Sequence, residues 1–109
     1  MDRFKFRVWD KYFKCYWTDE QVKTNIQWLL YPDNANIENF IIEQCTGLKD
    51  KNGKLIYEWD IVTDGVDIFE VVWDYNAWCI QTNNFQHFLT EGFEIIGNIH
   101  ENADLLGEK

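Results

Sequence analysis

The residues best suited to chemistry in this sequence are a phenol and two carboxylates that stand close together, at Tyr57, Glu58 and Asp60. Residues at positions i and i+2 of a β-strand share a face, so Glu58 and Asp60 would converge if a strand runs through them. Such a pair suits proton transfer or a metal ion. A hard cation, however, takes about six or more oxygen ligands, and no Asp-x-Asp-x-Asp-Gly loop is present. We therefore expect two solvated carboxylates beside a turn.

Three cysteines and two histidines complete the set of side chains that could act as nucleophile, base or metal ligand: Cys15, Cys45, Cys79, His87 and His100. The thiols are far apart and form no Cys-x-x-Cys pair, as a zinc site or a disulfide framework normally would. A catalytic cysteine needs a base, and only the two histidines are available. The glycines lie in separate turns and form no phosphate-binding loop. We expect no enzyme, no metal and no cofactor.

Charge divides the chain into two halves. The net charge is −9, yet residues 1–54 carry nine Lys and Arg against eight Asp and Glu, a sum of +1. Residues 55–108 carry no Lys or Arg, and their acids are Glu58, Asp60, Asp64, Asp67, Glu70, Asp74, Glu91, Glu94, Glu101, Asp104 and Glu108. Binding to nucleic acid or anionic lipid depends on Lys and Arg, so we expect no direct contact with either. An acidic half instead attracts basic groups, including Arg3, Lys5 and Arg7 of the same chain.

Hydrophobic periodicity predicts the elements of the first half. Alternation predicts a half-buried strand near the N-terminus, with one set of side chains inward and the other outward. The inward set is Phe4, Phe6 and Val8, and the outward set is Arg3, Lys5 and Arg7. Thr18 and Gln21 have the spacing of a capping box, and apolar residues follow at helical spacing, which predicts a helix over 19–30. Residues 32–36 are typical of a loop, and 40–45 of a short buried strand.

The second half predicts short strands joined by turns. Asn52-Gly53 is typical of a type I′ hairpin turn, because both residues tolerate positive φ. Further strands are expected at 60–62, 66–73, 77–82 and 93–99. The stretch 66–73 is apolar on both alternating faces, which predicts cover on both sides, inside a closed barrel or at a subunit contact. Short strands with frequent turns indicate a small barrel or sandwich, and 109 residues fit a single domain.

Three segments carry a family resemblance. Residues 44–62, QCTGLKDKNGKLIYEWDIV, resemble the signature of the YopX family, small proteins of phages and prophages. Residues 94–106, EIIGNIHENADLL, are similar to its C-terminal block, and 6–10, FRVWD, to its opening. The resemblance implies a mainly β (α+β) protein, with strands and one helix or irregular segment in 1–44 and an SH3-like small β-barrel in 45–109. The family has no established activity.

Three residues depart from the family pattern: Trp59 stands where Gly is usual, Cys45 where Tyr is usual, and Ala103 where Pro is common. A cysteine in an aromatic position argues against a catalytic thiol. A position that usually holds Gly seldom has room for an indole. We therefore expect Trp59 at the surface or against a neighbouring subunit.

Two functional hypotheses from different classes follow, beside an acidic protein with no partner except itself. The first is a non-enzymatic interaction module for a host or phage protein, with a surface formed by Trp59, Asp60, Asp64, Asp67, Glu70 and Trp73. The second is an acidic decoy that mimics nucleic-acid phosphates and occupies a basic host protein. Nineteen aromatic residues exceed what one small barrel covers, which predicts self-association, most simply a homodimer. No apolar run approaches the ~20 residues of a membrane span, and we expect a soluble protein of the host cytoplasm.

Overall fold

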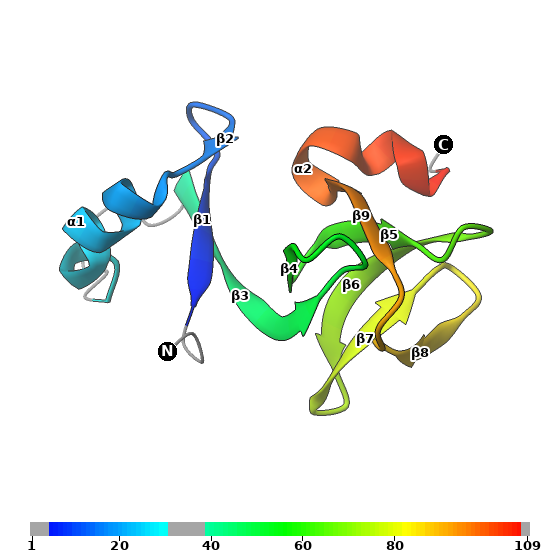
Figure 1. Ribbon diagram of the computed structural model, residues 1–109. Coiled ribbons are helices and arrows are strands. Elements are labelled where there is room, and N and C mark those ends of the chain that lie inside the picture. Colours follow the sequence, from blue (N-terminus) through cyan, green and yellow to red (C-terminus); the bar gives the residue numbers. More distant parts are fainter. Residues whose placement is uncertain (1–4, 31–38, 108–109) are drawn as a thin grey trace.

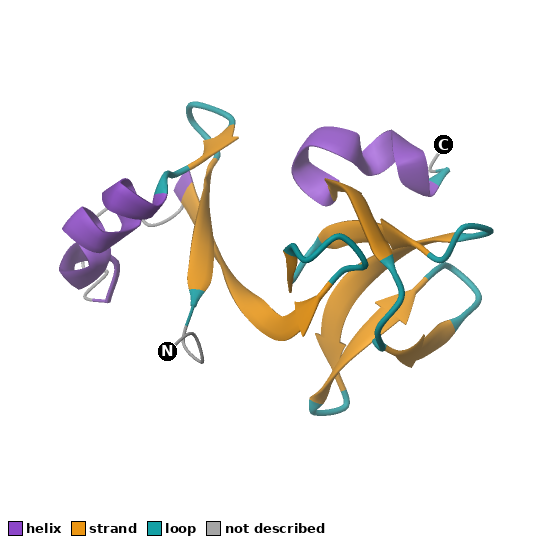
Figure 2. Cartoon of the chain, in the orientation of Figure 1, coloured by secondary structure: helices purple, strands orange, loops and turns teal. Residues whose placement is uncertain are grey.

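A computed structural model describes residues 5–30 and 39–107 of the chain. Along the chain the elements are β1 (Phe6–Asp10), β2 (Cys15–Tyr16), α1 (Asp19–Leu30), β3 (Phe40–Lys49), β4 (Leu55–Tyr57), β5 (Asp60–Thr63), β6 (Ile68–Asp74), β7 (Ala77–Gln81), β8 (Gln86–Phe88), β9 (Glu94–Asn98), α2 (Ile99–Asn102) and the 3-10 helix η2 (Ala103–Leu106). Strands dominate the described chain, and the helices lie to either side of them (Figure 2). The expected mainly β class is confirmed.

The strands form two antiparallel sheets (Figure 1). The N-terminal sheet has the order β2-β1-β3-β4, and the C-terminal sheet the order β8-β7-β6-β5-β9. The long strand β3 pairs with β1 along its first half, from Phe6↔Gln44 to Asp10↔Phe40. Along its second half it pairs with β4 through Cys45↔Tyr57 and Lys49↔Leu55. Strand β3 therefore connects the N-terminal end of the molecule to the side of the C-terminal sheet.

The apolar core lies between β4 and the inner face of the C-terminal sheet. It consists of Ile56, Val62, Phe69, Val71, Ile80, Leu89 and Phe93, all buried. Side chains of a strand alternate between its faces, so Phe69 and Val71 of β6 point to this core together. The curled sheet and the β3–β4 hairpin enclose these side chains.

The helix predicted over 19–30 is present as α1. Its first turn is a capping box: Gln21 N–H donates to Thr18 Oγ1 at 3.2 Å, and Thr18 N–H donates to Gln21 Oε1 at 2.8 Å. These reciprocal bonds satisfy N–H groups that the start of a helix leaves unpaired. The loop predicted at 32–36 lies outside the described residues. Within 5–30 and 39–107, no helix combines the length and apolarity that crossing a membrane requires.

The alternation predicted for the first strand is wrong at Arg7. Val8 is fully buried, as expected, and Phe6 is half-buried, but the Arg7 side chain is also turned inward against buried carboxylates. Strand β1 is covered on both faces, because the C-terminal part of the chain packs against the face that carries Arg7. Phe4 and Arg3 lie outside the described residues.

The hairpin predicted at Asn52-Gly53 joins β3 to β4, but its turn is not of type I′. Gly53 has φ +87, whereas Asn52 has no positive φ. Gly53 N–H donates to the Asp50 carbonyl, and the buried Asp50 carboxylate accepts from the N–H groups of Asn52 and Lys54. The Asp50 carboxylate therefore organises a turn that was expected to depend on two positive φ angles.

A two-residue turn with two positive φ angles instead joins β6 to β7. Tyr75 has φ 52 and Asn76 has φ 60, between the paired residues Asp74 and Ala77. Asn tolerates this left-handed conformation, but a bulky residue rarely adopts it. The turn holds the Tyr75 ring out from the sheet, 80% exposed.

The stretch 66–73 is only partly covered on both faces. Phe69, Val71 and Val72 are buried, but the strand begins at Ile68, and Val66 is exposed in the preceding turn. At the other end Trp73 is half exposed and packs edge-on against Trp78 of β7, with ring centroids 4.9 Å apart. The prediction that both faces of residues 66–73 are buried is therefore wrong at Val66 and at Trp73.

Candidate functional site

The most densely connected polar group surrounds Arg7 of β1. Its Nε donates to Glu43 Oε1 of β3 at 2.8 Å, and its Nη2 lies 2.8 Å from Asp60 Oδ1 of β5. The rings of Tyr16 and Tyr57 lie against the guanidinium, with their centroids 4.3 and 4.7 Å from Cζ. Arg7 therefore links the N-terminal sheet to the C-terminal sheet.

Glu43 is fully buried and has a partner at each oxygen. Oε1 accepts from Arg7 and also from the Tyr16 hydroxyl at 3.0 Å. Oε2 lies 2.5 Å from His100 Nε2 of α2. The His100 ring stacks on Trp9 of β1, with ring centroids 4.6 Å apart and planes 7° apart. We call Arg7, Glu43, Asp60, His100, Tyr16 and Tyr57 the Arg7 cluster.

Burial and charge act on this cluster in opposite directions. Burial works against the Arg7 cation, but the neighbouring Asp60, Tyr16 and Glu43 outweigh it, and the pKa of Arg7 is raised. Burial raises the pKa of Asp60, and Arg7 offsets part of this effect. Burial also raises the pKa of Tyr16 and brings the pKa of Tyr57 to about 12. Both phenols are therefore protonated at neutral pH, and they act as donors and ring surfaces rather than as bases.

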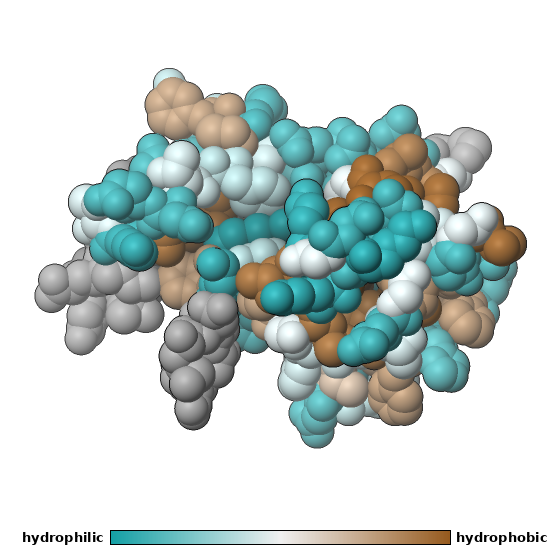
Figure 3. All heavy atoms as spheres, viewed as in Figure 1, coloured by the Kyte–Doolittle hydropathy of each residue, from teal (hydrophilic) through white to brown (hydrophobic). Residues whose placement is uncertain are grey.

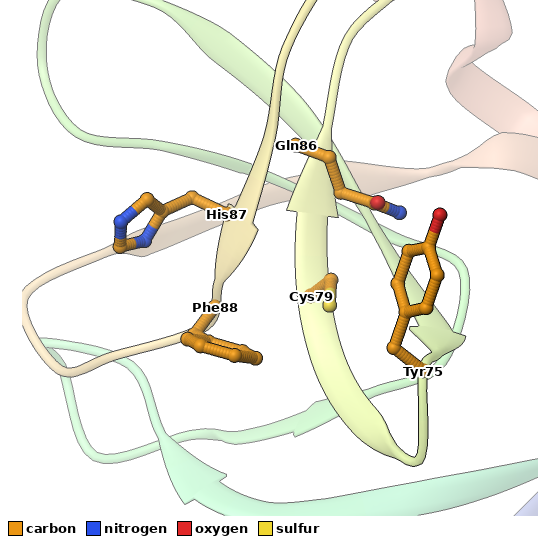
Figure 4. A pocket seen from close by; sticks show the side chains of 5 residues that line it. All are labelled: Tyr75, Cys79, Gln86, His87 and Phe88. Atoms are coloured by element: carbon orange, nitrogen blue, oxygen red, sulfur yellow. The ribbon is translucent and has the colours of Figure 1, made fainter.

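A second group of side chains surrounds a hollow of about 260 Å³ on the outer face of the C-terminal sheet. It is lined by Tyr75, Cys79, Gln86, His87 and Phe88, which we call the aromatic hollow (Figure 4). Figure 4 shows Tyr75 and Phe88 on either side of Cys79, and Gln86 directed toward the phenol end of Tyr75. The His87 ring points to the other side. The walls of the hollow are therefore two aromatic rings, and its floor is a buried thiol.

The rim of the aromatic hollow carries a carboxylate. Gln86 Nε2 donates to Asp74 Oδ2 at 3.1 Å, and the other oxygen of Asp74 accepts from Tyr75 N–H at 2.9 Å. Burial, and then the Asp74 charge, raise the pKa of the Cys79 thiol. Cys79 is thus kept as a neutral thiol and contributes an apolar surface. Among the described residues, no three His, Cys, Asp or Glu side chains form a group that could hold a metal ion.

The residues predicted to form an interaction surface do not share one. Asp60 is buried in the Arg7 cluster, so the two solvated carboxylates expected at Glu58 and Asp60 are not found. Burial also raises the pKa of the half-buried Glu58. Asp64 and Asp67 lie in the loop after β5, where Asp64 Oδ1 accepts from Asp67 N–H at 2.8 Å.

The remaining members of the predicted surface also lie apart from one another. Glu70 of β6 accepts from Gln81 Nε2 at 3.4 Å, and Trp73 is half exposed at the far end of the same strand. Trp59 is half-buried, and its backbone bonds to Val71 and Ile99. Its φ of 72 lies in the left-handed region that favours glycine, which accounts for the usual Gly at this position of the family.

Sequence reasoning missed both the Arg7 cluster and the aromatic hollow. A signal was present for the first, because Glu43 interrupts the apolar run 40–45 and a buried carboxylate needs a partner. For the second, the signal was Tyr75 beside Asn76 in a predicted turn, which places an aromatic ring at the surface.

The molecule is therefore a small, mainly β protein whose two antiparallel sheets are joined by a buried ionic cluster. The model of the family described as YopX protein matches residues 5–107, and the chain belongs to this family. The crystal structure of protein EF1440 from Enterococcus faecalis is similar, with a TM-score of 0.59 and 26% identity over 94% of this chain and 96% of that chain. No curated protein gives a match.

The three segments that carry the family resemblance meet in space. Residues 6–10 are β1, 44–62 run from β3 to β5, and 94–106 run from β9 to η2. Strands β5 and β9 pair through Asp60↔Asn98 and Ile61↔Gly97. The first segment supplies Arg7 to the Arg7 cluster, the second supplies Tyr57 and Asp60, and the third supplies His100. The resemblance therefore follows the contact between the two sheets.

Proposed function

We propose that the protein is a non-enzymatic protein-interaction module of a phage or prophage, built on an SH3-like barrel in residues 45–109. The C-terminal sheet, with the strand order β8-β7-β6-β5-β9, is curled, and this curvature supports the barrel. So do two bonds from the β3–β4 hairpin: Lys51 N–H donates to the Phe93 carbonyl at 2.8 Å, and Asp50 Oδ2 accepts from Ile95 N–H at 3.1 Å. These bonds bring the hairpin against the far edge of the sheet, as closure of a barrel requires.

The observation that carries the proposal is the aromatic hollow. Tyr75 is 80% exposed and Phe88 is 59% exposed, although both rings face the same depression. Aromatic side chains are enriched where proteins bind one another, because a ring buries a large area and loses little conformational entropy. The left-handed φ of Tyr75 is a strained backbone conformation, and such strain is concentrated at binding and catalytic sites. The module therefore binds through Tyr75 and Phe88.

The test is affinity capture from a bacterial host lysate with three immobilised proteins, followed by quantitative mass spectrometry. The first is the wild type, and the second carries Tyr75→Asn and Phe88→Thr, which remove both rings while keeping residues suited to the turn and the strand. The third carries Val66→Ser, an exposed apolar residue in a different loop. We expect proteins that the wild type and the Val66 variant retain and that the double variant loses. An identical set on all three proteins would contradict the proposal.

The decoy alternative requires that the acids of the second half form one broad exposed surface. Asp60 is instead buried against Arg7, and Glu94 pairs with Lys51 at 3.6 Å. Glu101 accepts from the Asn98 side chain at 3.0 Å. Several of these carboxylates therefore bond to other groups of the same chain, and no observation favours the decoy.

A further inference from the structure

A second exposed apolar surface, opposite in charge to the aromatic hollow, lies at the turn between β1 and β2. Tyr12 is 75% exposed and Phe13 is 72% exposed, with their ring centroids 4.8 Å apart. Lys11 and Lys14 flank them and are also exposed. We call residues 11–14 the hairpin tip. In Figure 3, apolar spheres stand out at the upper left, where Figure 1 places this turn.

Hydrogen bonds to Asp10 organise the backbone of the hairpin tip. The buried Asp10 carboxylate accepts from Tyr12 N–H at 2.9 Å, from Phe13 N–H at 3.0 Å and from Trp17 Nε1 at 3.1 Å. Burial would raise the pKa of Asp10, but these three bonds lower it, so the carboxylate is ionised at neutral pH. A turn organised in this way loses little entropy on binding, which favours a specific contact.

The aromatic hollow has the complementary properties. Its volume of about 260 Å³ exceeds the ~150 Å³ of a protein cavity that accommodates benzene, so it has room for one aromatic ring. Asp74 stands at its rim, and residues 55–107 contain no Lys or Arg that could neutralise it. An aromatic ring between two lysines therefore matches the hollow in shape, polarity and charge.

We propose that the hairpin tip of one copy binds in the aromatic hollow of a second copy. The Phe13 ring enters between Tyr75 and Phe88, and the ammonium groups of Lys11 and Lys14 face Asp74. In Figure 1 the β1–β2 turn lies at the upper left, far from the β6–β7 turn and β8 at the lower right, so the contact forms between copies and not within one. In a dimer with two-fold symmetry this contact forms twice, and the assembly is closed. This inference rests on the proposed function, because it uses the same hollow.

The experiment is sedimentation of the full chain at tens of micromolar, at about 0.15 M salt, where charges interact over only ~8 Å. The wild type should be a dimer. Variant A carries Lys11→Glu and Lys14→Glu, which give an acidic tip, and variant B carries Gln86→Lys, which puts a cation in the hollow. Each variant alone should be a monomer, with the dimer dissociation constant raised at least tenfold.

Mixing the two variants tests the contact itself. In a dimer of A with B, the acidic tip of A meets the basic hollow of B, and the unchanged tip of B meets the unchanged hollow of A. We expect the mixture to restore the dimer, which a folding defect could not do. As a control for the charge change, Lys23→Glu with Lys49→Glu alters two exposed lysines elsewhere and should leave the dimer intact.

Three results would overturn this inference: a monomeric wild type, dimers that survive both variants, or a mixture that stays monomeric. The capture experiment separates these failures from a failure of the proposed function. Host proteins that require Tyr75 and Phe88 would support an interaction module even if the chain does not bind itself.

Discussion

The two regions that hold this protein together use different chemistry. The core of the C-terminal sheet consists of apolar side chains such as Ile56, Val62 and Val71, all fully buried. The contact between the two sheets is the Arg7 cluster, with a guanidinium, an imidazole and two carboxylates. Apolar packing is non-directional and tolerates substitutions that conserve volume, whereas a buried ion pair depends on every partner being present. The core therefore supplies stability, and the Arg7 cluster specifies how the sheets are placed.

The largest loss of stability is expected for Arg7→Met, which keeps an unbranched side chain of similar reach and removes its charge. Glu43 and Asp60 would remain buried without their main partner, and we expect the free energy of unfolding to fall by about 3–5 kcal/mol. Urea denaturation followed by tryptophan fluorescence measures this change. As a matched control, Lys51→Met breaks the exposed pair with Glu94 and should cost less than about 1 kcal/mol. Equal losses in the two variants would show that the Arg7 cluster is no more important than a surface pair.

An intermediate loss in the free energy of unfolding is expected when Asp50 is replaced, because its carboxylate links the β3–β4 hairpin to β9. Burial raises the pKa of this carboxyl, but the N–H groups of Ile95, Lys54 and Asn52 outweigh that effect, and the pKa is lowered. Because the pKa is lower in the folded state, the stabilisation is present above the unfolded pKa of about 3.9 and is lost as the pH falls below it. Asp50→Ala should lower the free energy of unfolding by about 1–3 kcal/mol at neutral pH, since buried donors lose their acceptor.

Thermal unfolding of the wild type and of Asp50→Ala between neutral and acidic pH measures this effect. The difference between the two proteins should shrink as the pH falls. A difference that is constant over the whole range would mean that the Asp50 charge contributes nothing.

The smallest change in the free energy of unfolding is expected for substitutions of Trp59. The backbone of this residue bonds to Val71 of β6 and to Ile99 of α2. Trp59→Gly relieves the strain of a positive φ but loses the half-buried indole, so its net effect should lie within about 1 kcal/mol. Trp59→Ala loses the same ring and keeps the strain, so it should be less stable than Trp59→Gly by up to about 1 kcal/mol. Chemical denaturation of both variants checks the order, and an alanine variant at least as stable as the glycine variant would contradict it.

Local patterns predicted the elements, and long-range contacts account for what they missed. Thr18 and Gln21 are three residues apart, so the capping box could be read directly from the sequence. Glu43 bonds to Arg7 across 36 residues and to His100 across 57, and alternation along one strand carries no information about such partners. Arg7 was therefore assigned to the solvent side by a rule that considers only its neighbours in sequence.

The aromatic hollow escaped prediction for a related reason. Phe88 and Tyr75 come together only because β8 pairs with β7, through Cys79↔Phe88, and because a tight turn follows β6. Trp59 was assigned to the surface from the family pattern, and Trp73 belongs to the stretch 66–73, which is apolar on both alternating faces. Trp59 lies in the turn between β4 and β5, Trp73 lies on β6, and neither side chain lines the hollow.

The shared strand β3 has a consequence for the order of folding. The β6–β7 hairpin closes over two residues, whereas β1 must find β3 across α1 and the segment that follows it. Contacts between residues distant in sequence form late, because the entropy of closing the loop is lost before any contact forms. The Arg7 cluster should therefore be absent from the transition state, so that Arg7→Met accelerates unfolding and leaves the folding rate nearly unchanged. The same cluster that positions the two sheets would then provide kinetic stability, because it slows the unfolding of the folded protein.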